Sequence, residues 1–288
     1  SFNVKINDTI NNSIITGHYG EIYRDRDSAI ITKNALAVNI IKNDSIFIHS
    51  DTITITGANE KKILKGYYDV RILKSDVRGL SDSIHFNQDT GLIKLLKKPR
   101  SSRYLKRLSD EEKNKINPII WFGDNQITGD KIFLKSNIET EELDSLIIRG
   151  NVFMSQKDSL YDDRYNQIKG EKLDGFFTDG KLNNIYVVKN STLLYYMYSE
   201  ESELVGLNKT LASSILIKFL ENEISEVSFY KTPDGNVLSE SKILTNEMKL
   251  PGFIWREDER PDKISDLFSD SDKKLKIVEI EWSRLLII

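Results

Sequence analysis

The stretch NQITGDK at residues 125–131 recurs as NQIKGEK at residues 166–172, 41 residues further along the chain. A weaker copy, VGLNK, stands at residues 205–209. Each copy is followed by a second half-unit with regularly spaced apolar residues, as in LDSLII at residues 143–148. A period of about 40 residues predicts a stacked β-roll, in which each unit buries its apolar face against its neighbours.

Alternating apolar and polar residues predict short strands over most of residues 12–250. The stretches SIFIH at residues 45–49 and TITIT at residues 52–56 alternate with a period of two, which is typical of strands with one dry and one wet face. Turn-forming dipeptides separate such stretches, for example Thr-Gly at residues 90–91 and Asp-Gly at residues 179–180. We therefore expect an all-β fold, an elongated stack of antiparallel strands.

A charged segment at residues 100–116 interrupts this pattern. It is rich in Lys and Arg, and Ser109 is followed three residues later by Glu112, which matches a capping box at the start of a helix. We expect a short helical insertion between two strands.

A second interruption begins near residue 251, where a Pro- and acid-containing stretch replaces the alternation. The expected organisation is a repeat region at residues 1–250 followed by a cap or linker at residues 251–288. The final apolar stretch, residues 275–288, fits either a terminal strand or an edge that awaits a partner.

The bulk composition narrows the classes of partner. The 288 residues carry a net charge of −3, so nothing favours a nucleic acid as partner. No run of about 18 apolar residues occurs, so no membrane-spanning segment is expected. Residues 1–9 lack a basic stretch followed by an apolar one, and we expect either that a signal peptide has been removed or that the chain is an internal fragment. The absence of cysteine excludes thiol catalysis and disulfides.

Residues that could carry chemistry are isolated along the chain. His18, His49 and His85 stand alone, and a lone histidine in a strand is more often a packing or surface residue than a metal ligand. The acidic stretch at residues 269–272 lacks the Gly and the closing Glu of an EF-hand loop. Neighbouring acidic residues, as at residues 162–163, fall in expected turns. We expect no enzyme activity, no cofactor and no metal.

The repeated Asn-Gln-Ile-x-Gly-acidic-Lys unit, GFFTDGKL at residues 175–182 and LVGLNK at residues 204–209 together resemble the OstA-like repeat, the module of LptA and of the N-terminal domain of LptD. The stretch SEVSFYKTPDG at residues 225–235 resembles in particular the OstA-like proteins of Bacteroidetes-type bacteria. The resemblance covers roughly residues 17–260. The insertion and the tail after residue 272 depart from it.

The resemblance implies a β-jellyroll, also called a β-taco, in which a folded-over stack of antiparallel strands encloses an apolar interior. It implies a periplasmic protein that carries lipopolysaccharide, or its lipid A part, toward the outer membrane. Its other partners would be Lpt-type β-jellyroll proteins docked by edge strands, including further copies of the chain end to end. An acyl chain left in water costs about 0.8 kcal/mol for each CH₂, so such a lipid needs shielding.

The expected lipid groove is lined by inward-facing apolar residues of the repeats. These are Ile127, Ile132, Leu134, Leu146, Ile148, Ile168, Leu173, Ile185, Val187, Leu193, Ile215, Ile217, Val227 and Phe229. The alternative is a structural or interaction β-solenoid, a scaffold or surface stalk, in which the same side chains fill a closed core and leave no room for a lipid.

Overall fold

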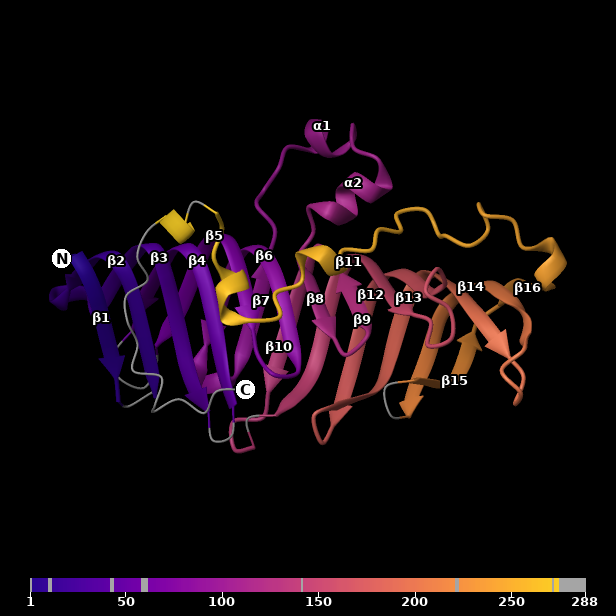
Figure 1. The fold of residues 1–288 in the computed structure, drawn as a ribbon, viewed down its shortest axis with the longest axis horizontal. Helices are drawn as coiled ribbons and strands as arrows, with labels where there is room; N and C mark the ends of the chain where they lie inside the picture. The colour runs from indigo at the N-terminus through magenta and orange to yellow at the C-terminus, as the bar shows by residue number, and fades with distance from the viewer. Residues whose placement is uncertain are drawn as a thin grey trace. The chain divides into compact units, whose positions relative to one another are not determined.

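The computed structural model describes residues 2–9, 12–41, 44–57, 62–140, 142–220, 223–270 and 272–274, and antiparallel β-strands dominate it (Figure 1). The predicted all-β fold of stacked antiparallel strands is confirmed. The chain divides into two compact units, which are described separately here. Unit 1 comprises Ser1–Lys98, Phe133–Leu143 and Asp258–Ile288, and unit 2 comprises Pro99–Ile132 and Asp144–Glu257.

Unit 1 is a meander in which each strand is hydrogen-bonded to the next. In spatial order its strands are β1 (Phe2–Asp8), β2 (Ser13–Tyr23), β3 (Ser28–Ile41), β4 (Asp44–Thr56), β5 (Ile63–Leu73), β6 (Val77–Asn87), β7 (Leu92–Leu96) and β10 (Lys131–Ser136).

Unit 2 is also built of antiparallel strands, of which β11 to β14 are the longest. In spatial order these are β8 (Ile119–Phe122), β9 (Asn125–Thr128), β11 (Leu143–Lys157), β12 (Tyr165–Thr178), β13 (Lys181–Tyr198) and β14 (Leu204–Leu220). Beyond them, β15 (Glu223–Tyr230) pairs with the second half of β14, and β16 (Asp234–Leu238) pairs with its first half.

The long strands turn a corner near their midpoints. The pairing register shifts at these points, for example between Thr32 and Ala35 in β3 and between Val188 and Ser191 in β13. Residues with positive φ stand at the corners, such as Lys189 at 67° and Asn190 at 50°. Because a bulge bends its strand, each long strand contributes to two half-sheets.

The two half-sheets of unit 1 face each other. Ile46 and Ile72, from one side of the corners, line the same space as Phe86 and Ile93, from the other side. The corners of unit 2 are tightly packed. A Cβ on Gly170, at the corner of β12, would lie 2.5 Å from Cγ1 of Val187, so an alanine there requires its neighbours to shift.

The predicted helical insertion is confirmed in unit 2. It consists of α1 (Ser102–Leu105) and α2 (Asp110–Lys115). Ser109 accepts a hydrogen bond from the backbone N–H of Glu112, and the Glu112 carboxylate accepts one from the backbone N–H of Ser109, so the capping box forms as the sequence indicates.

A segment with little regular structure follows β16, and we call residues 239–270 with 272–274 the C-terminal strap. Its short 3-10 helices are η3 (Glu240–Lys242), η4 (Glu257–Glu259), η5 (Ile264–Leu267) and η6 (Asp272–Lys274), and two others, η1 (Arg24–Arg26) and η2 (Gln88–Thr90), lie between strands of unit 1. Residues 239–257 of the strap belong to unit 2, and the remainder belongs to unit 1. The stretch at residues 275–288, expected to be a terminal strand or an edge, lies outside the described residues.

The strap packs on the outer face of a half-sheet in each unit. In unit 2 its Leu250 joins a buried cluster with Leu194 and Leu207. In unit 1 its Leu267 and Phe268 join a cluster with Leu36, Val38, Phe47 and Leu73. Neighbouring residues of a strand point to opposite faces of the sheet. In these strands one face is buried in the interior of the unit, and the other is buried under the strap.

Candidate functional site: the apolar interior

Most of the side chains expected to line a lipid groove are deeply buried. Twelve of the fourteen are at most 3% exposed: Ile127, Ile132, Leu134, Leu146, Ile148, Ile168, Leu173, Ile185, Val187, Leu193, Ile215 and Ile217. The other two, Val227 and Phe229, are half-buried. Much of the interior of unit 2 is therefore filled by its own side chains.

An open apolar hollow lies beside β15 in unit 2. It has a volume of about 230 Å³, and Leu193, Val227 and Phe229 line it together with Tyr195, Met197 and Ile224. Three of the predicted groove residues thus share one open surface. The remaining predicted residues of unit 2 do not line it.

A more enclosed cavity lies inside unit 1, between its two half-sheets. Its volume is about 140 Å³. The apolar lining comes from both half-sheets and from the segment around β10, through Ile46, Ile72, Val77, Phe86, Ile93, Leu134, Ile138 and Leu143. The lining also contains polar side chains, namely Asn39, Lys74, Asp76, Gln88, Ser136 and Asn137. A cavity of this size has room for a benzene-sized guest, or for a few carbons of a hydrocarbon chain.

Of the residues around this cavity, Leu134 alone belongs to the predicted groove. The recognisable repeat begins at residue 125, whereas this cavity is lined largely by the degenerate units before it. The same period-two alternation at residues 45–49 would have pointed to Ile46.

The rim of the unit 1 cavity is charged. Lys74, which borders it, pairs with Asp76 at 2.7 Å and with Asp44 at 3.1 Å. Burial favours the neutral amine of Lys74, but the two carboxylates outweigh this effect and raise the pKa of Lys74 above its usual value. Lys74 therefore stays protonated, and the two carboxylates neutralise its charge.

The three histidines lie in different surroundings. His18 is half-buried on β2 and contacts Asn3, and His85 on β6 faces the ring of Tyr67 with centroids 6.3 Å apart. His49 on β4 is fully buried and lies beside Asp272 of the strap. The acidic pair at residues 162–163 lies in the turn before β12, where Asp162 pairs with Lys157, so its environment is that of a solvated loop.

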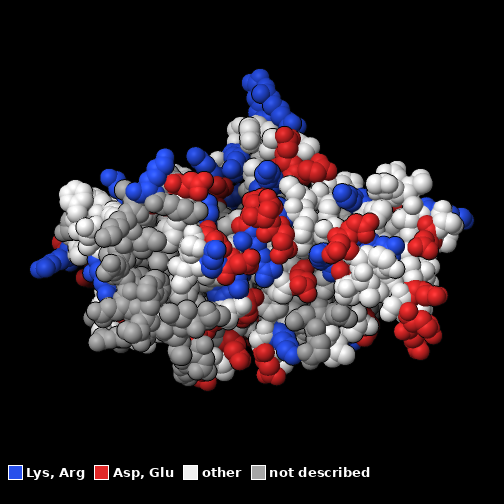
Figure 2. Space-filling view, in the orientation of Figure 1, with Lys and Arg blue, Asp and Glu red and all other residues white. Residues whose placement is uncertain are grey.

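The surface shows mixed charge. On the face drawn in Figure 2, acidic and basic side chains of the described residues are interspersed. Among those residues, the structure contains no helix with the length and apolar character required to cross a membrane.

Comparisons with known proteins yielded a likeness in fold and no match in sequence. No family model matches the chain. No curated protein matches it in sequence. Among solved structures, the chain is similar to LptH of Pseudomonas aeruginosa, described as the LptA-homologous periplasmic component of the lipopolysaccharide transport device, with 13% identity and a TM-score of 0.38. The match covers 57% of this chain and 94% of that one.

Proposed function

We propose that the protein is a periplasmic carrier or bridge module that shields acyl chains of lipopolysaccharide in its apolar interior. The observation that carries this proposal is the cavity in unit 1, whose lining includes eight apolar side chains. Burying a hydrocarbon chain against such side chains is favourable by about 0.8 kcal/mol for each CH₂.

The size of the cavity defines the mode of binding. About 140 Å³ holds the end of one chain and not a lipid with several chains. A complete lipopolysaccharide molecule would require the two half-sheets of unit 1 to move apart, and the hollow beside β15 would offer a second apolar surface of about 230 Å³. Binding should therefore widen the space around Phe86 and Leu134.

Strands at the edges of the sheet are suited to docking other proteins, as a bridge module requires. Within the described residues, β1 pairs only with β2, and β15 and β16 each pair only with β14. Unpaired backbone groups of an edge strand accept a further strand, so these edges would dock other β-jellyroll proteins or a further copy of the chain.

The experiment is photo-crosslinking of lipopolysaccharide with a probe at Ile138, on the wall of the cavity and 62% exposed. Leu134→Phe and Ile72→Phe add bulk inside the cavity and should reduce crosslinking severalfold, while Ile22→Phe, at an exposed position on β2, should leave it unchanged. Circular dichroism checks that each variant stays folded. Equal crosslinking in all folded variants would remove the cavity from the proposal.

A second candidate is a structural or interaction β-solenoid. It is favoured by the twelve predicted groove residues that are at most 3% exposed, because a filled interior needs no ligand. Mass spectrometry of lipids that co-purify with the protein separates the two functions. A stoichiometric lipid supports the carrier, and lipid-free protein that also fails to crosslink supports the scaffold.

A further inference from the structure

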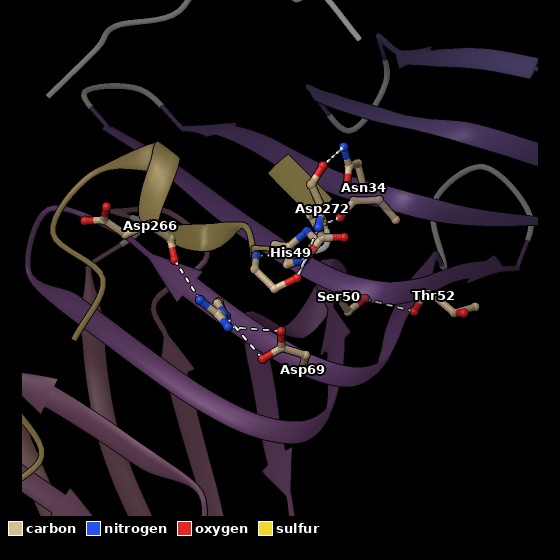
Figure 3. Close-up of polar contacts among 10 residues, drawn as sticks. Asn34, His49, Ser50, Thr52, Asp69, Asp266 and Asp272 are labelled. Carbon is tan, nitrogen blue, oxygen red and sulfur yellow. Dashed lines mark hydrogen bonds and ion pairs between the residues drawn. The ribbon is translucent and has the colours of Figure 1, made fainter. Parts of the chain in front are cut away.

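A buried histidine in unit 1 faces two carboxylates. His49 lies on β4 and Asp69 on β5, and Asp272 comes from the strap (Figure 3). One potential ligand atom from each of the three residues lies within 4.8 Å of the others. The site therefore joins three segments that are far apart in the sequence.

The ring of His49 is held in a defined orientation. Its side chain is 0% exposed, and Phe268 packs against it with ring centroids 4.9 Å apart. Nδ1 lies 2.9 Å from the backbone carbonyl oxygen of Ala35. A carbonyl can only accept, so Nδ1 carries the proton, and in the neutral ring Nε2 then holds a lone pair.

That lone pair is aimed at the carboxylates. Nε2 of His49 is buried and forms no hydrogen bond with the described residues, and its nearest charged neighbour is Oδ2 of Asp272 at 3.4 Å. The lone pair of Nε2 and the carboxylate oxygen repel each other when no proton lies between them. A cation bound between the two atoms would remove this repulsion.

The distance between two of the three candidate ligands fits such a cation. Two ligands bound at about 2.1 Å in tetrahedral geometry are separated by about 3.4 Å. The separation of His49 Nε2 and Asp272 Oδ2 is 3.4 Å. The ligand atoms of all three residues lie within 4.8 Å of one another, so the side chain of Asp69 would move inward to complete the site.

The carboxylates are oriented by further hydrogen bonds. Arg71 donates to both oxygens of Asp69, each at 3.1 Å, and also donates to the backbone carbonyl of Asp266 in the strap (Figure 3). Oδ2 of Asp272 accepts hydrogen bonds from the backbone N–H and the hydroxyl of Ser269. Such outer contacts are typical of metal-binding carboxylates, and the hydroxyl of Ser269 would rotate away to leave Oδ2 of Asp272 a lone pair for the ion.

We propose that His49, Asp69 and Asp272 bind one divalent cation of the zinc class, which fastens the C-terminal strap to β4 and β5. The imidazole nitrogen selects zinc over calcium and magnesium, which prefer oxygen ligands. Three protein ligands leave a fourth position for water. The site is independent of lipid binding, because it lies on the outer face under the strap and not in the cavity.

Calorimetric titration of chelator-treated protein with zinc sulfate tests the site. We expect one equivalent to bind with micromolar or tighter affinity and calcium to bind far more weakly. Asp272→Asn and His49→Asn should weaken zinc binding by about tenfold or more. His49→Asn is the informative variant, since its amide can still donate to the carbonyl of Ala35 while the Nε2 ligand is gone.

Two control variants match these changes in type. His85→Asn and Asp89→Asn remove a histidine and a carboxylate elsewhere in unit 1 and should leave zinc affinity unchanged. As a second readout, zinc should slow amide hydrogen exchange in residues 266–270, and Co²⁺ should give the intense visible bands of a four-coordinate site. Absence of saturable zinc binding, or equal affinity in folded His49→Asn protein, overturns the proposal and leaves an ordinary buried His–Asp pair.

Discussion

The side-chain amide of Gln167 accepts a hydrogen bond from the backbone N–H of Leu250 at 2.8 Å, and its Nε2 donates to the carbonyl of Met248, also at 2.8 Å. Gln126 repeats this arrangement, since it accepts from the N–H of Arg256 at 2.6 Å and donates to the carbonyl of Ile254 at 2.7 Å. Each glutamine thus pairs with the strap as a neighbouring strand would.

The two glutamines are structurally equivalent. Strands β9 and β12 flank β11, and Gln126 and Gln167 both pair in register with Ser155. The weaker copy makes a similar contact. Gln167 pairs with Leu194 of β13, which pairs in turn with Lys209 of β14. The Nζ of Lys209 contacts Glu247 of the strap at 2.8 Å. The repeated Asn-Gln-Ile stretch therefore holds the strap on one face and supplies a core isoleucine on the other.

Gln167→Ala should release the strap of unit 2. It removes hydrogen bonds to the buried N–H of Leu250 and to the part-buried carbonyl of Met248, each with a net contribution of about 1 kcal/mol. The N–H of Leu250 is then left without its acceptor. We expect the free energy of unfolding to fall by about 2–3 kcal/mol and amide exchange at residues 248–250 to accelerate. Gln88→Ala, which removes a contact to Asn39 in unit 1, should not affect exchange at residues 248–250.

Gly170→Ala should destabilise the protein through a steric clash at the corner of β12. The added Cβ would lie 2.5 Å from Cγ1 of Val187, and overpacking of this kind costs about 1–3 kcal/mol. Gly175→Ala, in the same strand, is the matched control because its Cβ would meet neighbours only at 3.4–3.6 Å. Chemical denaturation of both variants measures the difference, and equal stabilities would contradict the tight corner.

The clash can be tested by a double-mutant cycle. Val187→Ala removes the methyl group that the new Cβ would strike, so Gly170→Ala should cost less in that background. Strict additivity of the two substitutions would show that the clash is relieved elsewhere.

Tyr196 should make the protein sensitive to alkaline pH. Burial raises the pKa of Tyr196 from 10.0 to about 12. Between pH 10 and pH 12 this tyrosine loses its proton in the unfolded chain but keeps it in the folded protein. The free energy of unfolding is therefore highest below pH 10 and falls as the pH rises toward 12. The loss from this group is about 2–3 kcal/mol. Denaturant titrations at a series of alkaline pH values measure it.

Tyr196→Phe should remove this alkaline loss without destabilising the protein at neutral pH. The hydroxyl of Tyr196 is buried and forms no hydrogen bond with the described part of the chain, so its removal relieves the cost of an unpaired polar group, about 1 kcal/mol or more. A marked fall in stability at pH 7 would show that the hydroxyl has a stabilising partner.

Leu267→Ala should detach the strap in unit 1. The side chain is 0% exposed and packs in the cluster that contains Leu36 and Phe47. A buried Leu→Ala substitution costs about 2–5 kcal/mol. Leu244→Ala, at a strap position that is 63% exposed, should cost little, and limited proteolysis of the two variants reports whether the strap is released.

Local sequence was sufficient for the strands, the capped helix and the burial of most inward residues. Period-two alternation identifies which side chains share a face, and twelve of the fourteen chosen residues are deeply buried. Alternation could not identify the cavity. Side chains from two facing half-sheets either meet or leave a space, and the outcome depends on the volumes of the side chains on both. The groove assignment itself stays a prediction.

The sequence by itself determined the all-β fold and the equivalence of residues 125–131 and 166–172, because strand periodicity and repeats are local properties. Only the tertiary structure decided what covers the outer faces of the half-sheets. The strap forms hydrogen bonds with residues far away in the sequence, and the one between Asp272 and Asn34 joins residues 238 positions apart. The same long-range packing brings His49, Asp69 and Asp272 together. Contacts at such separations are set by the way the whole chain folds back, which no window of sequence contains.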